Sequence, residues 1–269
     1  PTLGMVVVRE AAIFAFVPEP FYTVQLTLDR FTAVSERFHD KKTADEIRNK
    51  CGKAGSCMVS KVEKQEKAEK PPLLYDLTTL QREANQKYGF SAKETLNIMQ
   101  RLYETHKVLT YPRTDSRYIG KDVVPTIKER LKACGTGPYR KLAGAILSKP
   151  VQTNGSFVDD KKVSDHHAII PTEQFVQLDH MTNEERKIYD MVDRRFLSVL
   201  YPPFVYEQTS VEGTAAGYKF AAKGKSVKEL GWKAVYEDGF QDDSEDAEEQ
   251  EMKDQILPVF HKGSRLQIE

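Results

Sequence analysis

Residues 109–119 read LTYPRTDSRYI, and this stretch decides how the middle of the chain folds. A proline disfavours helical backbone in the residue before it, so Pro112 places Tyr111 in an extended conformation. The sequence therefore predicts an extended segment over 108–113 rather than a continuation of the helical pattern that precedes it.

A helix is expected immediately before this segment. Ser91 and Glu94 form a capping box, in which each side chain bonds to the backbone of the other residue. The apolar positions that follow recur at helical spacing and are expected to share one face: Leu96, Met99, Leu102 and Tyr103. This helix should end near Thr105.

Helical and strand patterns alternate outward from this centre. Further helices are expected near 76–88, where Asp76 is the cap and Gly89 the stop, and near 122–133, 139–148 and 182–200. The last opens with a second capping box, Thr182 to Glu185. Residues 1–16 and 41–50 also fit helices. Strand patterns occupy 20–38, 58–68, 204–236, 256–260 and 265–268.

Two proline pairs, Pro71-Pro72 and Pro202-Pro203, divide these patterns. We therefore predict a multidomain α and β fold in which a helical domain, 71–202, is inserted into a strand-rich domain formed by 17–70 and 203–269. Residues 1–16 are interpreted as the end of a further helical domain, and a start at Pro1 without an initiator Met favours a fragment of a longer protein.

The net charge is zero, with 40 basic and 40 acidic side chains among 269 residues. Residues 237–254 hold ten acids and one base, so the remaining chain has 39 bases, 30 acids and a net charge of +9. Such a basic surface suits a polyanionic partner. We interpret the acidic run as a solvated loop, in preference to a strip that mimics DNA.

Composition excludes other classes of protein. No apolar run approaches the roughly 20 residues of a membrane helix, and the start of the chain lacks a signal-peptide pattern. The odd cysteine count favours free thiols in a reducing compartment. Cys51 and Cys57 lack the second Cys/His pair that a tetrahedral zinc site needs.

The side chains of 111–117 favour phosphate chemistry. A phenol with a pKa of about 10 is a poor nucleophile at neutral pH and needs a nearby positive charge or a base. In extended backbone Arg113 projects to the same side as Tyr111, where its guanidinium would hold a phosphodiester. In the same register Asp115 would orient Arg113, and Arg117 would hold another phosphate. The alternative is a core tyrosine with solvated neighbours.

A second polar segment, SDHHAIIPT, spans residues 164–172. Adjacent His166 and His167 could ligate a metal, but no third ligand lies at a useful spacing. A histidine beside a DNA phosphate would donate hydrogen bonds or carry positive charge near neutral pH. Taken alone, the segment favours a solvated or hydrogen-bonded core histidine over a DNA contact.

These two segments belong to a series of motifs that resembles the cleavage region of type IA DNA topoisomerases, most closely the bacterial topoisomerase III branch. The others are Pro1-Thr2-Leu3-Gly4, Pro71-Pro72-Leu73, Leu77 to Gln81, Gly89 to Thr95 and Gln100 to Glu104. The motifs follow the family's order and spacing over essentially the whole chain. The tyrosine segment and His167 to Thr172 are the most specific.

The resemblance implies roles for individual residues. Tyr111 resembles the nucleophile that takes the 5′-phosphate of a broken strand and releases a 3′-hydroxyl. Arg113 resembles the arginine that positions and stabilises the scissile phosphate, and His166 the histidine that helps order the DNA. Weaker candidates for DNA contact are Gln81, Asp115, Ser116, Arg117, His167 and Thr172.

The resemblance also implies an ATP-independent isomerase that acts on DNA, preferring single strands, as a monomer in the bacterial cytoplasm at the nucleoid, with no membrane. The family's Mg²⁺ is held by a Toprim domain, and we find no equivalent of its carboxylates in this sequence. The chain alone is therefore expected to hold no metal and to be inactive in DNA relaxation. The strand-rich domain would form a gate that hinges at the proline pairs.

Two other interpretations compete with this one. Tyrosine recombinases place an Arg/His set before a tyrosine near the chain end, whereas Tyr111 precedes His166 here. A non-catalytic helix-turn-helix module could use helices 77–88 and 92–105, which a glycine-containing turn joins. That module would bind specific duplex sequences, whereas the topoisomerase interpretation predicts a preference for single strands.

Overall fold

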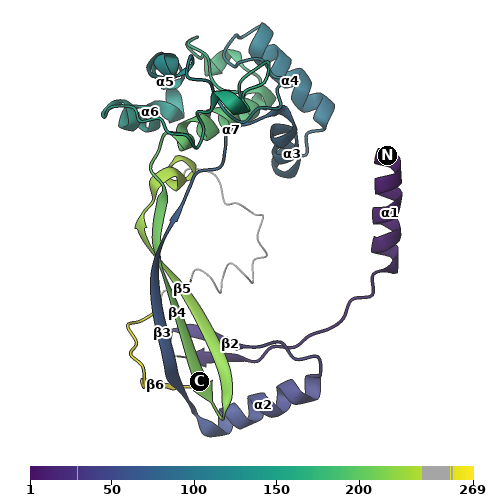
Figure 1. Ribbon diagram of the computed structural model, residues 1–269, viewed down its shortest axis with the longest axis vertical. Helices are drawn as coiled ribbons and strands as arrows, with labels where there is room; N and C mark the ends of the chain where they lie inside the picture. Colours follow the sequence, from purple (N-terminus) through teal and green to yellow (C-terminus); the bar gives the residue numbers. More distant parts are fainter. Residues whose placement is uncertain (29, 238–254, 256) are drawn as a thin grey trace. The chain divides into compact units, whose positions relative to one another are not determined.

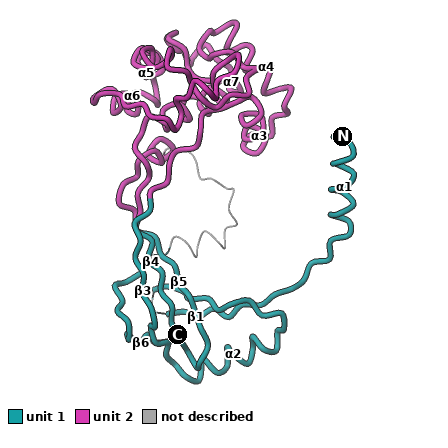
Figure 2. The backbone as a smooth tube through the Cα atoms, viewed as in Figure 1, with its two compact units in different colours: residues 1–67, 207–226, 243–269 teal, residues 68–206, 227–242 magenta. Residues whose placement is uncertain are grey.

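The chain forms two compact units in the computed structural model, which describes residues 1–28, 30–237, 255 and 257–269 (Figures 1 and 2). Unit 1 comprises 1–67, 207–226 and 243–269, and unit 2 comprises 68–206 and 227–242. Strands β3 (Ser56–Glu69), β4 (Phe204–Ala215) and β5 (Tyr218–Glu229) contribute residues to both units. The predicted mixture of helices and sheet is confirmed.

A six-stranded sheet with the order β1-β2-β5-β4-β3-β6 organises unit 1. Its remaining strands are β1 (Gln25–Leu28), β2 (Phe31–Ser35) and β6 (Arg265–Gln267). β1 pairs antiparallel with β2, β2 with β5, and β3 with β6. Helix α2 (Lys41–Ala54) packs on the sheet through Ala44, Ile47 and Cys51.

Buried and exposed side chains alternate along β1, within the stretch 20–38 where the sequence predicts strand. Val24, Leu26 and Leu28 are buried, whereas Thr23, Gln25 and Thr27 are exposed, so one face of β1 is dry. Strands β3 and β4 approach each other so closely at Gly213 that only glycine fits there. A Cβ atom at Gly213 in β4 would lie 2.6 Å from Cys57 Sγ in β3. Helix α1 (Thr2–Ala15) has no buried residue.

Unit 2 is built from α-helices, namely α3 (Leu77–Tyr88), α4 (Ala92–Glu104), α5 (Ile127–Cys134), α6 (Arg140–Leu147) and α7 (Asn183–Val199). Side chains cap the N-termini of α3, α4 and α7. Asp76 caps α3 and Gly89, with φ 72°, ends it. Both predicted capping boxes are present, at Ser91 and at Thr182.

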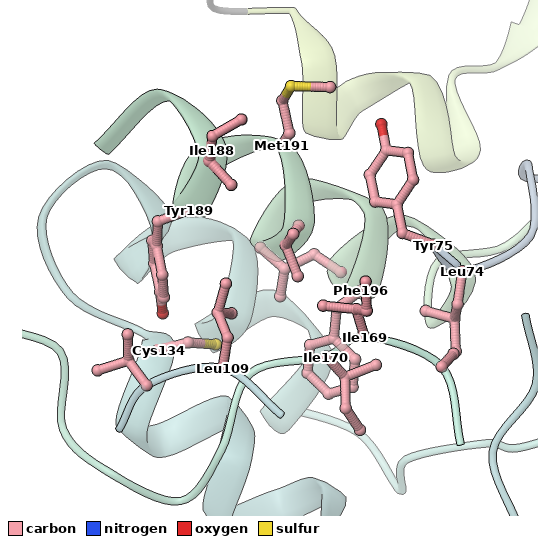
Figure 3. Close-up of a cluster of buried hydrophobic side chains, with 14 of the residues drawn as sticks. Leu74, Tyr75, Leu109, Cys134, Ile169, Ile170, Ile188, Tyr189, Met191 and Phe196 are labelled. Atoms are coloured by element: carbon pink, nitrogen blue, oxygen red, sulfur yellow. The ribbon is translucent and has the colours of Figure 1, made fainter. Parts of the chain in front are cut away.

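One apolar core holds these helices together, and both polar segments contribute to it. Figure 3 shows Leu109 and Ile169-Ile170 in the same cluster as Tyr189 and Phe196 of α7. Leu109 and Ile170 are fully buried. The apolar residues of the tyrosine and histidine segments thus anchor the two segments in the core.

One carboxyl group is buried in this core. Asp193 of α7 has no exposed surface, and the Cys134 thiol lies beside it. Burial raises the pKa of Asp193 to about 8, while the adjacent Cys134 thiol lowers it. Asp190 raises this pKa further and Arg194 lowers it.

Some expected elements differ from those observed. Helix α2 continues to Ala54, since it stops only where Gly55 adopts φ 63°. The expected helices near 122–133 and 139–148 each begin with a 3₁₀ turn that contains a proline, Val124–Thr126 and Gly137–Tyr139. Residues 231–236 form the 3₁₀ helix Gly231–Tyr236 rather than strand.

Two further expectations concern the end of the chain. Residues 257–260 are not strand, contrary to prediction. Apart from Glu237, the acidic run 237–254 lies outside the described residues.

The two capping boxes allow a matched test of stability. Glu185 is 3% exposed and pairs with Arg101 (Nε to Oε1, 2.7 Å), whereas the equivalent Glu94 is exposed and has only its capping contacts. We expect Glu185→Ala to lower the free energy of unfolding by about 1–3 kcal/mol, because it removes a buried carboxylate that contacts Arg101, the half-buried His106 and the Thr182 amide. Glu94→Ala should lower it by about 0.5–1 kcal/mol.

Urea unfolding followed by the fluorescence of Trp232, which lies in unit 2 and is the single tryptophan, measures both changes. Equal losses of unfolding free energy for the two variants would contradict the stabilising role given to the contact between Glu185 and Arg101.

Candidate DNA-cleavage site

Backbone and side-chain hydrogen bonds join the tyrosine segment to the histidine segment. Thr110 N donates to Ile170 O (3.0 Å), and Thr172 N donates to Val108 O (3.0 Å). The Thr110 hydroxyl also accepts from Ile170 N (3.0 Å). The Thr114 hydroxyl donates to His166 O (2.9 Å). These contacts fix the position of one segment relative to the other.

Exposed and buried side chains alternate along the tyrosine segment, as extended backbone requires. The outward set, exposed or half-buried, is Tyr111, Arg113, Asp115 and Arg117. The buried set is Pro112, Thr114 and Ser116. Tyr111 and Arg113 therefore project to the same side, as the sequence predicts.

The ring of Tyr111 lies between two other rings. The His166 ring centroid is 4.4 Å away at an interplanar angle of 41°. On α4, Tyr103 makes an edge-to-face contact at 5.6 Å and 81°. We call Tyr103, Tyr111 and His166 the aromatic row. The fold thus brings together Tyr111 and His166, which are far apart in sequence.

A turn held by the buried Glu185 connects α4 to the tyrosine segment. Glu185 of α7 accepts from Arg101 and also lies 3.3 Å from His106 Nε2. Burial opposes ionisation, but Arg101, the Thr182 amide and His106 hold the pKa of Glu185 below its ordinary value. Lys107 adopts φ 59° and its carbonyl accepts from the Thr172 hydroxyl (2.6 Å). The turn is therefore bonded to both α7 and the histidine segment.

The far end of the histidine segment is bonded to α5. Arg130 donates from Nη1 to Pro171 O (2.7 Å), and its Nη2 lies 2.9 Å from Glu173. Arg130 is 8% exposed. Its guanidinium therefore stabilises the fold and is not available to bind a ligand.

Several candidate residues use their polar atoms within the fold. The Ser116 hydroxyl donates to Lys162 O (2.8 Å) from a buried position, and Gln81 Nε2 donates to Ala92 O (2.9 Å). His167 Nδ1 lies 2.7 Å from Ala168 O. Arg117 Nε donates to Leu74 O (3.1 Å). Ser116 therefore does not share the surface of Tyr111 and Arg113.

Arg113 and Asp115 are exposed on that surface but do not form the expected pair. Asp115 accepts instead from the Ser164 hydroxyl (2.8 Å). Arg113 makes no ion pair with any described residue, so its guanidinium is available to an anionic ligand. We had no sequence signal for Ser164 as a partner, because the contact spans 49 residues.

Tyr103 is the residue of the aromatic row that the sequence pattern misplaced. It was expected on the apolar face of α4, yet it is 38% exposed. The buried positions of α4 are instead Thr95, Ile98, Met99 and Leu102. Tyr103 directly follows the buried Leu102, and adjacent residues of a helix do not share a face. The sequence holds no other signal against a buried Tyr103.

The described residues contain no group of three or more His, Cys, Asp or Glu side chains that could hold a metal ion. The carboxylates of Glu185 and Asp115 are bonded to protein groups, Glu185 to Arg101 and Asp115 to the Ser164 hydroxyl. Within the same described ranges, no helix is long and apolar enough to cross a membrane.

Comparisons with known proteins agree with this geometry. The sequence model of the DNA topoisomerase family matches residues 1–269. The chain is 48% identical over 275 residues to DNA topoisomerase 3 of Bacillus cereus (strain ATCC 14579) and 43% identical over 276 residues to that of Bacillus subtilis (strain 168). Each match covers the whole chain but only 37% of the relative's length.

A solved structure is also similar. Full-length topoisomerase I from Thermotoga maritima aligns with 99% of this chain and 42% of its own, with a TM-score of 0.73 and 25% identity. The chain belongs to the bacterial DNA topoisomerase family, within the type IA class. Its identity to the Bacillus proteins makes it topoisomerase III-like, and it spans just over a third of their length.

Proposed function

We propose that this chain supplies the cleavage tyrosine and gate of a type IA DNA topoisomerase that breaks and reseals one DNA strand without ATP. The observation that carries the proposal is the surface shared by Tyr111, the unpaired Arg113 and His166. A phosphodiester that approaches this surface meets a phenol, a guanidinium and an imidazole. That set provides a nucleophile, and it provides hydrogen-bond donors for the negative charge that develops on the phosphoryl oxygens.

The proposed reaction exchanges one phosphodiester for another. The Tyr111 phenol oxygen attacks phosphorus and loses its proton to solvent or a base. The bond between phosphorus and the 3′ oxygen breaks, and that oxygen leaves as a hydroxyl after taking a proton. The 5′-phosphate stays on Tyr111, and attack by the 3′-hydroxyl reverses each step. Because one ester replaces another, resealing needs no ATP.

The part of the enzyme outside this chain would complete the site. Type IA topoisomerases are generally Mg²⁺-dependent through a Toprim domain, and the described residues offer no such site. We therefore propose that 1–269 alone do not relax supercoiled DNA. We further propose a preference for single-stranded DNA, a monomeric state and a location at the bacterial nucleoid. The strand-rich parts, 17–70 and 203–269, would act as a gate for 71–202.

A chimera tests this function. Residues 1–269 would replace the matching stretch of Bacillus cereus DNA topoisomerase 3, and an oligonucleotide labelled at its 3′ end would be added with magnesium. We expect label to remain on the protein and to map to the peptide that contains Tyr111. A folded chimera that binds the oligonucleotide but forms no adduct would favour a non-catalytic binding module.

That second candidate rests on one observation. Helices α3 and α4 are joined by a three-residue connection, 89–91, in which Gly89 has φ 72°, as in a helix-turn-helix. Such a module would bind one duplex sequence more tightly than the same single strand. Competition between duplex and single-stranded DNA for the chain distinguishes the two candidates.

Arg113 offers a test of how the site stabilises charge. In the chimera, Arg113→Ala is expected to slow adduct formation by about 10²–10³-fold, as loss of a positioned donor does elsewhere. Arg113→Lys should fall between Ala and wild type, because lysine keeps the charge but loses the planar fork. The exposed Arg140 on α6 is the charge-matched control. Equal rates for Arg113→Ala and Arg140→Ala would remove Arg113 from the site.

A further inference from the structure

The contact between Tyr103 and Tyr111 has no role in the function proposed so far. Tyr103 lies in the last turn of α4 and is 38% exposed, although a ring of its size is usually more buried. Both Tyr103 and His166 contact the Tyr111 ring, at centroid distances of 5.6 Å and 4.4 Å. The aromatic row therefore restricts the directions in which the Tyr111 ring can turn.

The backbone, rather than the ring contact, holds Tyr103 in this place. After α4 the chain reverses through a turn in which His106 N donates to Arg101 O (3.0 Å) and Val108 N to Leu102 O (3.0 Å). The reversal carries the extended segment back past Tyr103. Glu185 binds the turn through Arg101 and His106, so α7 fixes its position.

A fixed ring direction matters for a nucleophile on a surface. An exposed tyrosine samples three staggered χ1 rotamers, and only one of them presents its oxygen to a phosphate in a given place. An edge-to-face contact favours one rotamer by a population ratio of about 3 to 10. The reacting geometry is then present before the DNA arrives, which raises the rate of the chemical step.

We propose that Tyr103 is a positioning residue for Tyr111, and that it acts through its ring rather than its hydroxyl. The proposal rests on the proposed function, since it assigns Tyr111 as the nucleophile. It concerns the rate of cleavage and not the binding of DNA. A different role, in which a DNA base stacks on Tyr103, predicts the opposite division between rate and affinity.

Two substitutions in the chimera separate these roles. Tyr103→Leu removes the ring and keeps a good helix former, while Tyr103→Phe keeps the ring and removes the hydroxyl. With saturating oligonucleotide, we expect adduct formation to slow about 3- to 10-fold in Tyr103→Leu and less than twofold in Tyr103→Phe. The dissociation constant for the oligonucleotide should change less than twofold in both.

Two results would overturn the proposal. An unchanged rate in Tyr103→Leu would show that the ring contact is not used. Weaker binding of the oligonucleotide with an unchanged saturated rate would assign Tyr103 to base stacking instead.

A second measurement on the 269-residue chain does not depend on activity. The three-bond couplings from the Tyr111 Cγ to its amide nitrogen and carbonyl carbon report χ1, and Tyr111→Phe identifies the signals. We expect one dominant rotamer in the wild type and Tyr103→Phe, and averaging in Tyr103→Leu. One rotamer in all three would reject positioning by Tyr103. If the wild-type chimera forms no adduct, the proposed function fails while these couplings still decide the positioning.

Discussion

The Tyr111→Phe chimera is expected to form no covalent adduct with DNA and to relax no supercoiled plasmid. The substitution removes one oxygen, and no other phenol of the aromatic row can replace it, because Tyr103 meets Tyr111 through its ring at a centroid distance of 5.6 Å. The ring contact with His166 survives in phenylalanine, so the surface keeps its shape. Binding of a single-stranded oligonucleotide should change less than twofold.

Tyr118 provides the matched control for this experiment. It lies seven residues further along the chain and is half-buried, and its hydroxyl lies 3.3 Å from Lys162 Nζ. Tyr118→Phe should leave adduct formation intact. An adduct that persists in Tyr111→Phe, or disappears in Tyr118→Phe, would place the nucleophile elsewhere.

The second large effect concerns stability and pH, and it arises from Asp193. Burial raises the pKa of this carboxyl to about 8 in the folded protein, from 3.8 in the unfolded chain. The folded state therefore binds the proton more tightly. The resulting stabilisation is complete below pH 3.8 and is lost as the pH rises to about 8.

The loss should approach 1.4 kcal/mol per pH unit inside this window, with a total on the order of 5 kcal/mol. Above pH 8 the contribution of Asp193 becomes constant. Asp193→Asn has nearly the same shape but does not titrate, so it removes this dependence. The difference between the unfolding free energies of wild type and Asp193→Asn cancels the contribution of every titrating group whose pKa Asp193 does not affect.

Trp232 fluorescence in urea, at several pH values from 5 to 9, measures that difference. The charged and titratable groups that influence Asp193 are Cys134, Asp190 and Arg194, and they are identical in the two proteins. Parallel curves for wild type and Asp193→Asn would show that Asp193 is ionised or solvated in the folded state.

Features of the fold that depend on neighbouring residues could be predicted from the sequence. Both capping boxes, the Asp76 cap and the Gly89 stop involve atoms within a few residues of one another, so the pattern determines them. The dry face of β1 follows from period-two alternation for the same reason.

Features that depend on distant residues could not be predicted in this way. The sequence placed Ser116 at the DNA surface, but its hydroxyl bonds to Lys162 O, 46 residues away. Asp115 was expected beside Arg113, but it bonds to Ser164. Residues 231–236 depart from strand because Gly231 adopts φ 50° close to the Pro203 carbonyl, where a Cβ would lie 2.2 Å from that oxygen.

In the candidate site too, features that depend on neighbouring residues could be predicted from the sequence, and those that depend on distant residues could not. Extended backbone at Pro112 placed Tyr111 and Arg113 on one side, which is a local property. The approach of His166 to Tyr111 required the resemblance to a family, because nothing in the spacing of the two segments shows that they meet. Tyr103 was misplaced because its exposure depends on where the chain reverses after α4. The functional roles of these residues stay predictions.

The hydrogen bonds between the two segments also set the order of events during synthesis. Tyr111 leaves the ribosome well before Thr172, the last residue that bonds to its segment. At about 5–20 residues per second, the interval is roughly 3–12 seconds. His166 and Ile170 emerge only near the end of that interval, so for most of it the nascent Tyr111 lacks the contacts that fix its position. The proposed nucleophile would thus reach its fixed position only after the histidine segment has been translated and has docked.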